Sequence, residues 1–457
     1  MGELAITDAQ LRELSTEALR LANEYWAEVE RRPAYPRTDG GRTTELFSRP
    51  WADAGRGAVV LEDFESIAAH SRPSGGKFFA YVFGSGEPVS ALADLLAGTL
   101  NQNVTAWRSG PAAAAIEHTV VGWLASALGC EGMKGTLCGG GSAANLMALA
   151  MARESRLPAN EEGVRPCAVY MSEQAHMSMP KAVAMLGIGR RNLRAVPVDD
   201  QFRMRTDMLE TAIEADKAAG LTPIAVVATA GTVNTGAIDP LQEVSAIARR
   251  HGLWMHVDGA YGALAALAAP EKFAGLSLAD SISLDAHKWL YQTVDCSCLL
   301  YRDAQAARKA FAFSGDYAKS LSHDPIEGHV FFDETMELSR RFRALKLWMS
   351  LQYHGRKAFR DAIAKDLEHA RLFADLVRSE RQLELLAPVE LSAVCFRHRD
   401  RDNAAILPGV IGRGRVYISN ATIHGRFALR ACFVNHRATE ADVRAIVSEV
   451  LAVAGGL

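Results

Sequence analysis

Two short apolar runs of the chain each lead into residues with reactive side chains. Ser281–Leu284 is followed by His287 and Lys288, and Leu253–Val257 is followed by Asp258. Runs of this length suit two neighbouring strands of an α/β sheet, whose carboxyl ends face one crevice. An amine and a carboxylate are therefore expected to face each other at the edge of a sheet.

This pair matches what pyridoxal 5'-phosphate requires of a protein. A lysine forms a Schiff base with its aldehyde, and an acid keeps the ring nitrogen protonated so that the ring accepts electrons. Taken alone, Lys288 would be interpreted as a solvated surface charge and Asp258 as a helix cap or turn residue. The interpretation depends on a third segment.

That segment is rich in glycine and runs from Gly139 to Asn145, directly before a helix-favouring stretch, Leu146 to Arg153. The free N–H groups at the start of a helix hold a phosphate, Gly141 permits close approach, and Ser142 adds a hydroxyl donor. The alternative is a flexible loop before an ordinary helix. Nucleotide-binding motifs do not explain the segment, because it is neither G-x-G-x-x-G nor followed by Gly-Lys-Ser/Thr.

The order of these pieces resembles the group II pyridoxal-phosphate-dependent amino acid decarboxylases, which include aromatic amino acid, glutamate and histidine decarboxylases. The similarity extends from about Tyr81 to the C-terminus. It implies the aspartate aminotransferase-like fold (fold type I): an α/β protein with a mainly parallel sheet covered by helices and a small C-terminal α+β domain. The matching motifs are Ser172–His176, Ala228–Thr232, His256–Tyr261, Asp285–Trp289 and Arg340–Trp348.

The resemblance also implies roles for individual residues. Lys288, Asp258 and His176 are expected to be catalytic, together with Tyr317, whose spacing from the lysine matches a loop tyrosine that protonates the substrate α-carbon after carbon dioxide leaves. Relatives with phenylalanine in place of that tyrosine tend to form aldehydes. The residues expected to bind the cofactor are Gly141, Ser142, His176, Thr232, Asp258, Ala260, Asp285, His287 and Lys288.

The resemblance places the substrate pocket in two segments. Tyr81, Val82 and Phe83 are expected to form one wall, and Asn103 and Thr105 to reach the site of a partner subunit across a dimer interface. The second segment is more polar than in typical aromatic decarboxylases, and the tryptophan that these enzymes carry shortly before the first segment is missing.

Three further residues keep two interpretations. Arg108 is either a contact to a second substrate carboxylate or part of a structural ion pair. Arg430 either contacts the substrate or bridges elements of the C-terminal domain. Asp239 follows a Gly-Ala-Ile turn, so a local turn role competes with a role at the cofactor.

Four segments are predicted from the pattern of the chain. The first contains an amphipathic helix over Gln10–Val29 and is expected to pack on the partner subunit. The second alternates helical patterns with short apolar runs, which is typical of a parallel sheet covered by helices. The segments are 1–77 (N-terminal helical segment), 78–305 (large cofactor-binding domain), 306–330 (mobile active-site loop) and 331–457 (small C-terminal domain).

The composition is that of an ordinary globular enzyme, with 457 residues, 49% hydrophobic and 23% charged. A net charge of −3 gives no reason to expect a nucleic acid or membrane partner. The seven cysteines suggest reduced thiols in the cytoplasm, and Cys296 and Cys298 lack partners at zinc-site spacing, so no metal is expected. No signal peptide or membrane-spanning run is found.

The sequence therefore predicts a homodimeric, cytoplasmic, pyridoxal-phosphate-dependent decarboxylase of an L-amino acid, with an aromatic substrate expected. An oxidative deaminase that forms aldehydes, or a carbon–carbon lyase, would use the same Lys288 and Asp258. A non-catalytic relative that only binds the cofactor would be expected to have lost Lys288, Asp258 or Tyr317, and the chain keeps them.

Overall fold

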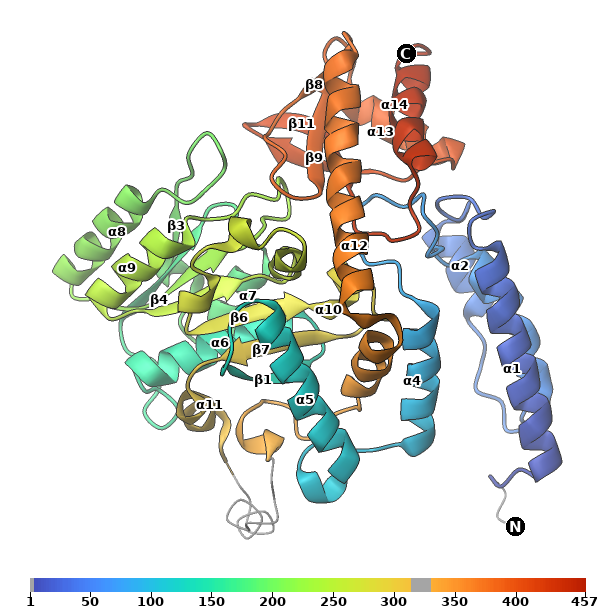
Figure 1. Cartoon of the computed structure of the whole chain (residues 1–457), viewed down its shortest axis with the longest axis horizontal. Helices are drawn as coiled ribbons and strands as arrows, with labels where there is room; N and C mark the ends of the chain where they lie inside the picture. Colours follow the sequence, from blue (N-terminus) through green and yellow to red (C-terminus); the bar gives the residue numbers. More distant parts are fainter. Residues whose placement is uncertain (1–3, 314–329) are drawn as a thin grey trace.

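The computed structural model describes residues 4–313 and 330–457. Its centre is a seven-stranded sheet of order β1-β7-β6-β5-β4-β2-β3 with helices on both faces (Figure 1). Strand β7 runs antiparallel to both neighbours, and the other adjacent strands run parallel. The predicted α/β class with a mainly parallel sheet is confirmed. The strands are β1 (Lys134–Cys138), β2 (Cys167–Ser172), β3 (Leu193–Val196), β4 (Thr222–Thr229), β5 (Trp254–Asp258), β6 (Ser281–Asp285) and β7 (Ser297–Tyr301).

Both faces of this sheet are buried, which explains why its strands are almost continuously apolar in sequence. Along β4, Val226 and Ala228 belong to one hydrophobic core and Ala225 and Val227 to another. The first core is completed by α5 (Pro111–Ala127), α8 (Thr206–Ala218) and α9 (Leu241–His251). The second is completed by α6 (Gly141–Arg156), α7 (Ser178–Met185) and α11 (Ala304–Phe311).

A smaller antiparallel sheet of order β10-β11-β9-β8 lies in the C-terminal region, as predicted. The long helix α12 runs from the large sheet to this small one (Figure 1) and is kinked at Gly355, whose φ of 74° is not helical. The elements are α12 (Ala344–Ser379), β8 (Leu383–Leu385), β9 (Ala393–His398), α13 (Asn403–Arg413), β10 (Ser419–Ile423), β11 (Arg426–Cys432) and α14 (Glu440–Ala454).

The N-terminal region is helical, and the apolar stripe of its first helix is only partly covered by the rest of the chain. Helix α1 buries none of its residues and extends along the outside of the molecule (Figure 1). The N-terminal helices are α1 (Asp8–Glu28), α2 (Gly40–Phe47), α3 (Asp63–Ala69) and α4 (Pro88–Leu100). The C-terminal part of the stripe packs on the chain itself, since Tyr25 meets Phe64 edge to face at 6.4 Å, whereas Leu11 nearer the start of α1 is exposed.

One predicted boundary needs correction. The segment 306–330 was expected to be a mobile loop, but its first residues belong to α11. The helix forms because the Asp303 side chain accepts the backbone N–H of Gln305, and because Ala306 and Ala307 are buried against α6. The rest of that segment lies largely outside the described residues.

Candidate active site

A cavity of ≈ 430 Å³ lies where β5 and β6 end and α6 begins. Most of the residues expected to bind the cofactor line it, namely Gly141, Ser142, His176, Asp258, Ala260, Asp285, His287 and Lys288. The topology explains this convergence, because the carboxyl ends of parallel strands and the N-termini of the following helices lie at the same sheet edge.

Lys288 lies in the single helical turn α10 (Ala286–Trp289), directly after β6. Its Nζ is 2.8 Å from Oδ2 of Asp285, whose Oδ1 accepts the Ser297 hydroxyl at 2.5 Å. Burial works against ionisation of Asp285, but the charges of Lys288 and His287 outweigh it and hold the pKa of this carboxyl below its ordinary value. The lysine is therefore oriented by an ion pair at the edge of the cavity.

Asp258 is the last residue of β5 and is almost fully buried. Its carboxylate accepts hydrogen bonds from Asn145 Nδ2 at 3.1 Å, from the Ser283 hydroxyl at 3.2 Å and from the Ala260 N–H at 3.2 Å. Neutral donors thus fix the position of the carboxylate. A buried, oriented carboxylate of this kind suits a protonated ring nitrogen.

The first residues of α6 form a narrow cradle. Gly140 has a φ of 142°, which other residues avoid. A Cβ on Gly141 would lie 2.8 Å from the Ala260 Cβ and 3.1 Å from both Asp285 oxygens, so only glycine fits there. The N-terminus of α6 can consequently be approached closely by an anion such as a phosphate.

Arg343 is a residue of this site that the sequence reasoning missed. It is buried and lies beside the cradle, since a Cβ on Gly139 would be 3.4 Å from Arg343 Nη2 and 3.0 Å from Asp295 Oδ2. Arg343 also bonds to Glu337 at 2.8 Å and to Asp295 at 3.1 Å. It lies within the Arg340–Trp348 motif, so the match to the family was the available signal.

His176 lies in the turn between β2 and α7 and lines the cavity. Its Nδ1 is 3.0 Å from the Ser178 hydroxyl and accepts the Ser178 N–H at 3.2 Å. Burial lowers the pKa of His176, and the nearby Lys288 adds to this effect, although Asp258 opposes it. The imidazole is thus favoured in its neutral form.

These groups fit pyridoxal 5'-phosphate. The cavity offers a lysine amine, a buried carboxylate held by donors, and a helix N-terminus that excludes any side chain larger than hydrogen at Gly141. Among residues 4–313 and 330–457, no group of three or more His, Cys, Asp or Glu side chains is arranged to hold a metal ion.

Thr232 is the exception among the expected cofactor residues. Its hydroxyl is 2.9 Å from Thr235 Oγ1 and accepts the Ala237 N–H at 3.2 Å, so it forms hydrogen bonds within the turn that it begins. The neighbouring Gly231 and Val233 line the cavity instead. Contact between Thr232 and the cofactor stays a prediction.

The structure distinguishes the interpretations of two other residues. Asp239 accepts the backbone N–H groups of Met204 and Thr229, each at 2.7 Å, which is the local turn role. Arg430 donates to the carbonyls of Tyr81 and Asn234 at 3.1 and 3.2 Å, so these bonds link β11 to two loops of the large domain and not elements within the C-terminal domain, and its contact with substrate stays a prediction.

The segment Tyr81–Phe83 lies beside Lys288 without lining the cavity itself. The next residue, Gly84, packs directly on the backbone of His287 and Lys288, and a Cβ there would be 2.5 Å from the Lys288 carbonyl oxygen. Tyr81 and Phe83 are exposed, at 52% and 42%, whereas Val82 is buried. Their contact with substrate stays a prediction.

Asn103 and Thr105 do not reach this cavity. Asn103 Oδ1 accepts the N–H of Arg340 at 2.9 Å, and the Thr105 carbonyl accepts the N–H of Phe331 at 3.0 Å. Their expected place is in the site of a partner subunit, which stays a prediction. Tyr317 lies outside the described residues.

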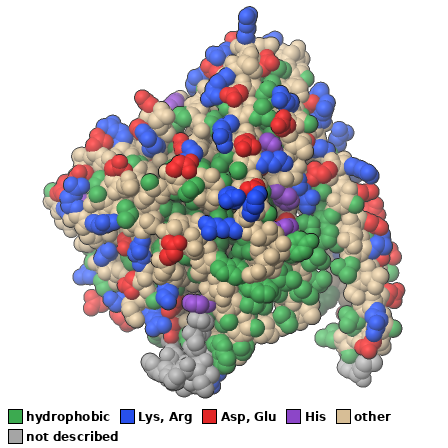
Figure 2. Space-filling model, in the orientation of Figure 1, with side chains coloured by type: hydrophobic (Ala, Val, Ile, Leu, Met, Phe, Trp, Pro, Cys, Tyr) green, Lys and Arg blue, Asp and Glu red, His purple; other side chains and the backbone are tan. Residues whose placement is uncertain are grey.

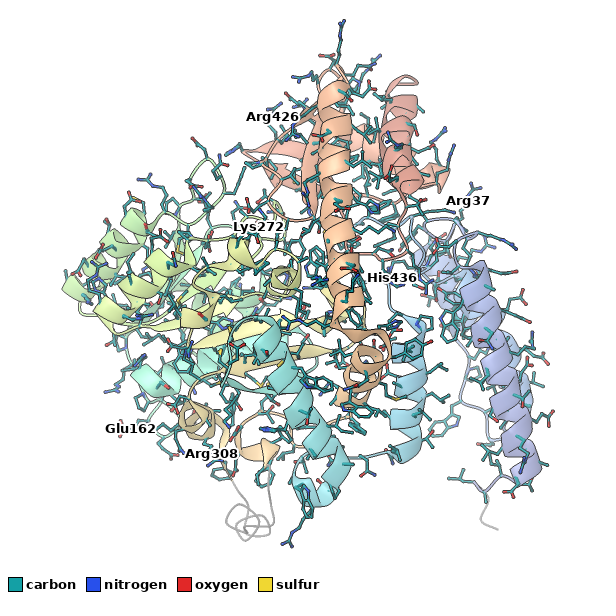
Figure 3. The ribbon with its side chains drawn as sticks, viewed as in Figure 1. Arg37, Glu162, Lys272, Arg308, Arg426 and His436 are labelled. Atoms are coloured by element: carbon teal, nitrogen blue, oxygen red, sulfur yellow. The ribbon has the colours of Figure 1, made fainter. Side chains whose placement is uncertain are left out.

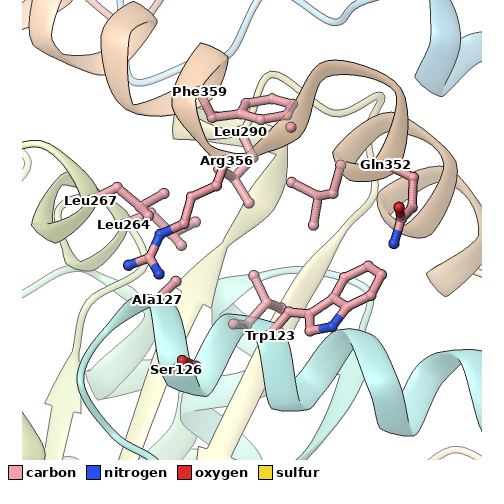
Figure 4. A pocket seen from close by; sticks show the side chains of 12 residues that line it. Trp123, Ser126, Ala127, Leu264, Leu267, Leu290, Gln352, Arg356 and Phe359 are labelled. Atoms are coloured by element: carbon pink, nitrogen blue, oxygen red, sulfur yellow. The ribbon is translucent and has the colours of Figure 1, made fainter.

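A second cavity of ≈ 330 Å³ lies between α5 and the kink of α12 (Figure 4). Its walls are mainly apolar, with Trp123, Leu264 and Phe359 around a single arginine, Arg356. The lining contains no carboxylate and no lysine. The chemistry expected of the chain therefore belongs to the cavity at Lys288.

Comparison with known proteins agrees with this site. The model of the pyridoxal-dependent decarboxylase conserved domain matches residues 58–399. The chain is 31% identical to an aromatic-L-amino-acid decarboxylase of Bacillus atrophaeus, over 99% of this chain and 97% of that protein. It is 33% identical to a phenylacetaldehyde synthase of Petunia hybrida, over 77% of this chain and 75% of that protein.

A solved structure shows the same fold. The crystal structure of Oryza sativa TDC with PLP and tryptamine matches with a TM-score of 0.92 and 27% identity, covering 100% of this chain and 99% of that one. The family match spans most of the chain, including Lys288 and Asp258. The chain belongs to the pyridoxal-dependent decarboxylase family.

Proposed function

We propose that this enzyme decarboxylates an aromatic L-amino acid to the corresponding amine. The observation that carries the reaction type is the meeting of Lys288, Asp258 and the α6 N-terminus in one cavity. When bound, pyridoxal 5'-phosphate supplies a ring that accepts the electrons of the bond broken at the α-carbon.

Each residue around the cavity is given a separate role in binding the cofactor or in the reaction. The Lys288 amine is the group that would hold it covalently, and the N–H groups at the start of α6 would hold its phosphate, with Arg343 as a nearby cation. Asp258 would keep a proton on the ring nitrogen. His176 would face the substrate side of the cavity. Tyr317 is proposed to deliver the proton to the α-carbon.

An aromatic substrate is proposed because aromatic side chains gather on and around the loop that precedes Gly84, outside the lining of the cavity at Lys288. Phe78 and Tyr417 stack at 4.9 Å, and Tyr81 and Phe83 meet edge to face at 5.8 Å, next to the Gly84 contact with the lysine backbone. Aromatic rings favour stacked and edge-to-face neighbours. Two of the similar proteins point to the same substrate class: the aromatic-L-amino-acid decarboxylase of Bacillus atrophaeus by its name, and the Oryza sativa structure by its bound tryptamine.

We also propose that two copies of the chain assemble. Figure 2 shows hydrophobic side chains gathered over the region where α4 and α5 lie, next to the outlying helix α1. Leu92, Leu95, Leu96 and Leu100 of α4 are between 39% and 56% exposed. Contiguous exposed apolar side chains of this kind are typical of surfaces that bind another protein. Light scattering should give a dimer, and Leu95→Glu should produce monomers.

We propose a cytoplasmic location from the state of the cysteines. All seven cysteines, which all lie within the described residues, are buried and unpaired, which suits a reducing compartment. None of the described helices is long and apolar enough to cross a membrane.

Product analysis tests the proposed function. The purified protein, loaded with pyridoxal 5'-phosphate, is incubated in air with tyrosine, tryptophan, phenylalanine, DOPA and 5-hydroxytryptophan, and with glutamate as the non-aromatic control. Amine and carbon dioxide from an aromatic substrate are expected. An aldehyde with ammonia would instead indicate oxidative deamination, cleavage elsewhere a carbon–carbon lyase, and turnover of glutamate alone would exclude the aromatic substrate.

A variant of the loop tyrosine separates the first two reactions. Tyr317→Phe keeps the ring and loses the hydroxyl that would donate the proton. The product is expected to shift from amine towards aldehyde, measured by mass spectrometry. An unchanged yield of amine would remove Tyr317 from the proton-donor role and leave the cofactor site as described.

A further inference from the structure

A row of buried polar side chains lies directly behind the cavity and joins β5, β6, α6 and α7. Trp254 Nε1 donates to Ser281 Oγ at 2.8 Å, and Ser281 Oγ is 2.9 Å from His256 Nδ1. His256 Nε2 is in turn 2.9 Å from Asn145 Oδ1. Each of these side chains is less than 4% exposed, so no water competes for the hydrogen bonds.

The orientation of the Asn145 amide follows from its neighbour Asp258. An ionised carboxylate only accepts hydrogen bonds, so the NH₂ group of Asn145 must face Asp258, at 3.1 Å. The Asn145 oxygen then faces His256 Nε2, which must carry a proton to donate to it. The amide cannot turn over without placing its oxygen against the carboxylate.

The protonation of His256 gives the row a direction. Burial lowers the pKa of His256 to about 4, so the imidazole is neutral near pH 7. With the proton on Nε2, its Nδ1 is an acceptor and takes the hydroxyl hydrogen of Ser281. Ser281 Oγ is free to do so because it already accepts from Trp254. Every donor in the row therefore points towards Asn145.

The row continues from Asn145 to His176. The second N–H of Asn145 donates to Ser178 Oγ at 3.1 Å, which leaves the Ser178 hydroxyl hydrogen for His176 Nδ1 at 3.0 Å. The backbone N–H of Ser178 also donates to this nitrogen, at 3.2 Å. Nδ1 of His176 thus receives hydrogen bonds and gives none. A neutral imidazole in this setting carries its proton on Nε2.

We propose that Asn145 is a positioning residue that holds His176 as the neutral tautomer protonated on Nε2. His176 lines the cavity, and among the residues that the structure describes its Nε2 has no hydrogen-bond partner. His176 consequently offers the substrate an N–H donor, and it lacks the free lone pair there that a base needs to remove the α-proton. The same Asn145 orients Asp258, so one amide sets both groups.

The inference has a chemical consequence for the choice of reaction. Pyridoxal phosphate enzymes that begin by removing the α-proton need a base near the α-carbon, and with His176 protonated on Nε2 the Lys288 amine would be the group left to act as that base. A donor at Nε2 can bind the substrate carboxylate or return a proton later. The inference depends on His176 lining the catalytic cavity and not on which amino acid is the substrate.

Nitrogen-15 NMR of protein labelled only in histidine tests the proposal directly. The His176 signal is identified by its loss in His176→Gln. At pH 7.5 the wild type should show the pattern of a neutral ring protonated on Nε2. Asn145→Ala should shift the signal only part of the way towards the other tautomer, because the Ser178 N–H still donates to Nδ1, and should lower kcat about 10-fold with little change in KM.

The control is Asn192→Ala, because within the part of the chain that the structure describes the Asn192 side chain bonds only to the Ile188 carbonyl, at 2.7 Å, and Asn192 does not line the cavity. It should leave the His176 signal and kcat as in the wild type. A wild-type ring protonated on Nδ1 would overturn the proposal, and so would an unchanged His176 signal in Asn145→Ala. If Asn145→Ala does not fold, Ser178→Ala takes its place, and an unchanged signal there counts against the proposal equally.

Discussion

The two ends of the cavity hold their key residues by different means. At the ring end, Asp258 is fixed by neutral donors, namely an amide, a hydroxyl and a backbone N–H. At the other end, beside the start of α6 where the phosphate would bind (the phosphate end), Lys288 and Arg343 are held by the carboxylates of Asp285, Asp295 and Glu337. The position of Asp258 therefore depends on the direction of each hydrogen bond, whereas the positions of Lys288 and Arg343 depend on the balance of positive and negative charge.

The difference suits the two tasks. A ring nitrogen must meet one oxygen in one orientation, and strand ends with directed donors supply this precision. A phosphate carries charge over several oxygens and tolerates small displacements, so nearby cations and helix N–H groups suffice. Substitutions at the ring end should therefore affect the rate, and those at the phosphate end should affect cofactor affinity, apart from the lysine itself.

Loss of the lysine should have the largest effect. Lys288→Ala removes the covalent anchor and leaves Asp285 buried without its cation, so turnover should fall by about 10³-fold or more. The visible absorbance of the bound cofactor should vanish as well. Lys272→Ala is the control, because Lys272 lies on the outer surface and pairs with Glu390 at 2.7 Å (Figure 3). Near-native turnover of Lys288→Ala would contradict the assignment.

A neutral replacement at the ring end comes next. Asp258→Asn keeps the size of the side chain and removes its charge, so kcat should fall by about 10²- to 10³-fold, while the cofactor still binds. Asp239→Asn is the matched control. It is equally buried at the same sheet edge, and burial raises its pKa to about 6, but it faces a turn. Equal losses of kcat in both variants would refute a special role for Asp258.

At the phosphate end, a single methyl group should weaken cofactor binding. Gly141→Ala places a Cβ 2.8 Å from Ala260 and 3.1 Å from the Asp285 oxygens, so the dissociation constant of pyridoxal 5'-phosphate should rise about 10-fold. A fluorescence titration of the apoprotein measures it. Gly122→Ala on α5 has nothing within 4 Å and should bind the cofactor as the wild type does. Unchanged binding by Gly141→Ala would mean that the cradle is not where the phosphate lies.

The smallest predicted effect concerns a carboxylate behind the lysine turn. Asp366 accepts the Tyr291 hydroxyl at 2.8 Å, and burial raises its pKa from 3.8 to about 7. The folded state thus keeps a proton that the unfolded state loses between about pH 4 and pH 7, so stability falls as pH rises through this range. Asp366→Asn should remove part of that slope in urea unfolding curves. The same slope in both proteins would contradict the raised pKa.

Much of the fold followed from the sequence because the large sheet is buried on both faces. The two apolar runs predicted as strands, Leu253–Val257 and Ser281–Leu284, correspond to β5 and β6 to within one residue at each end. Strand β1 was missed because its sequence, Lys-Gly-Thr-Leu-Cys, has only a short apolar end. In the C-terminal segment predicted from residue 331, the long helix α12 begins only at Ala344, because the preceding residues form a short turn and charged contacts around Arg340 and Arg343.

The site was predicted where motifs carry it and missed where only packing does. Lys288, Asp258 and the α6 glycines stand at the ends of elements, which a pattern can locate. Asn145 and Arg343 lie within segments that the sequence analysis singled out, but their contacts are to neighbours distant in sequence, so the segments alone do not give their roles. Thr232 was placed at the cofactor by its motif, yet the turn at Thr235 takes its hydroxyl.

The contact of Gly84 with the lysine turn also limits how this enzyme can change over evolution or by design. Because the Gly84 backbone rests on the carbonyls of His287 and Lys288, the loop that carries Tyr81 and Phe83 has a fixed height above the lysine. Its exposed side chains can be exchanged to favour other substrates, while insertions or a larger residue at position 84 would displace the reactive amine. We therefore expect that substrate preference changes through substitutions of these exposed side chains, while the backbone of the loop keeps its conformation.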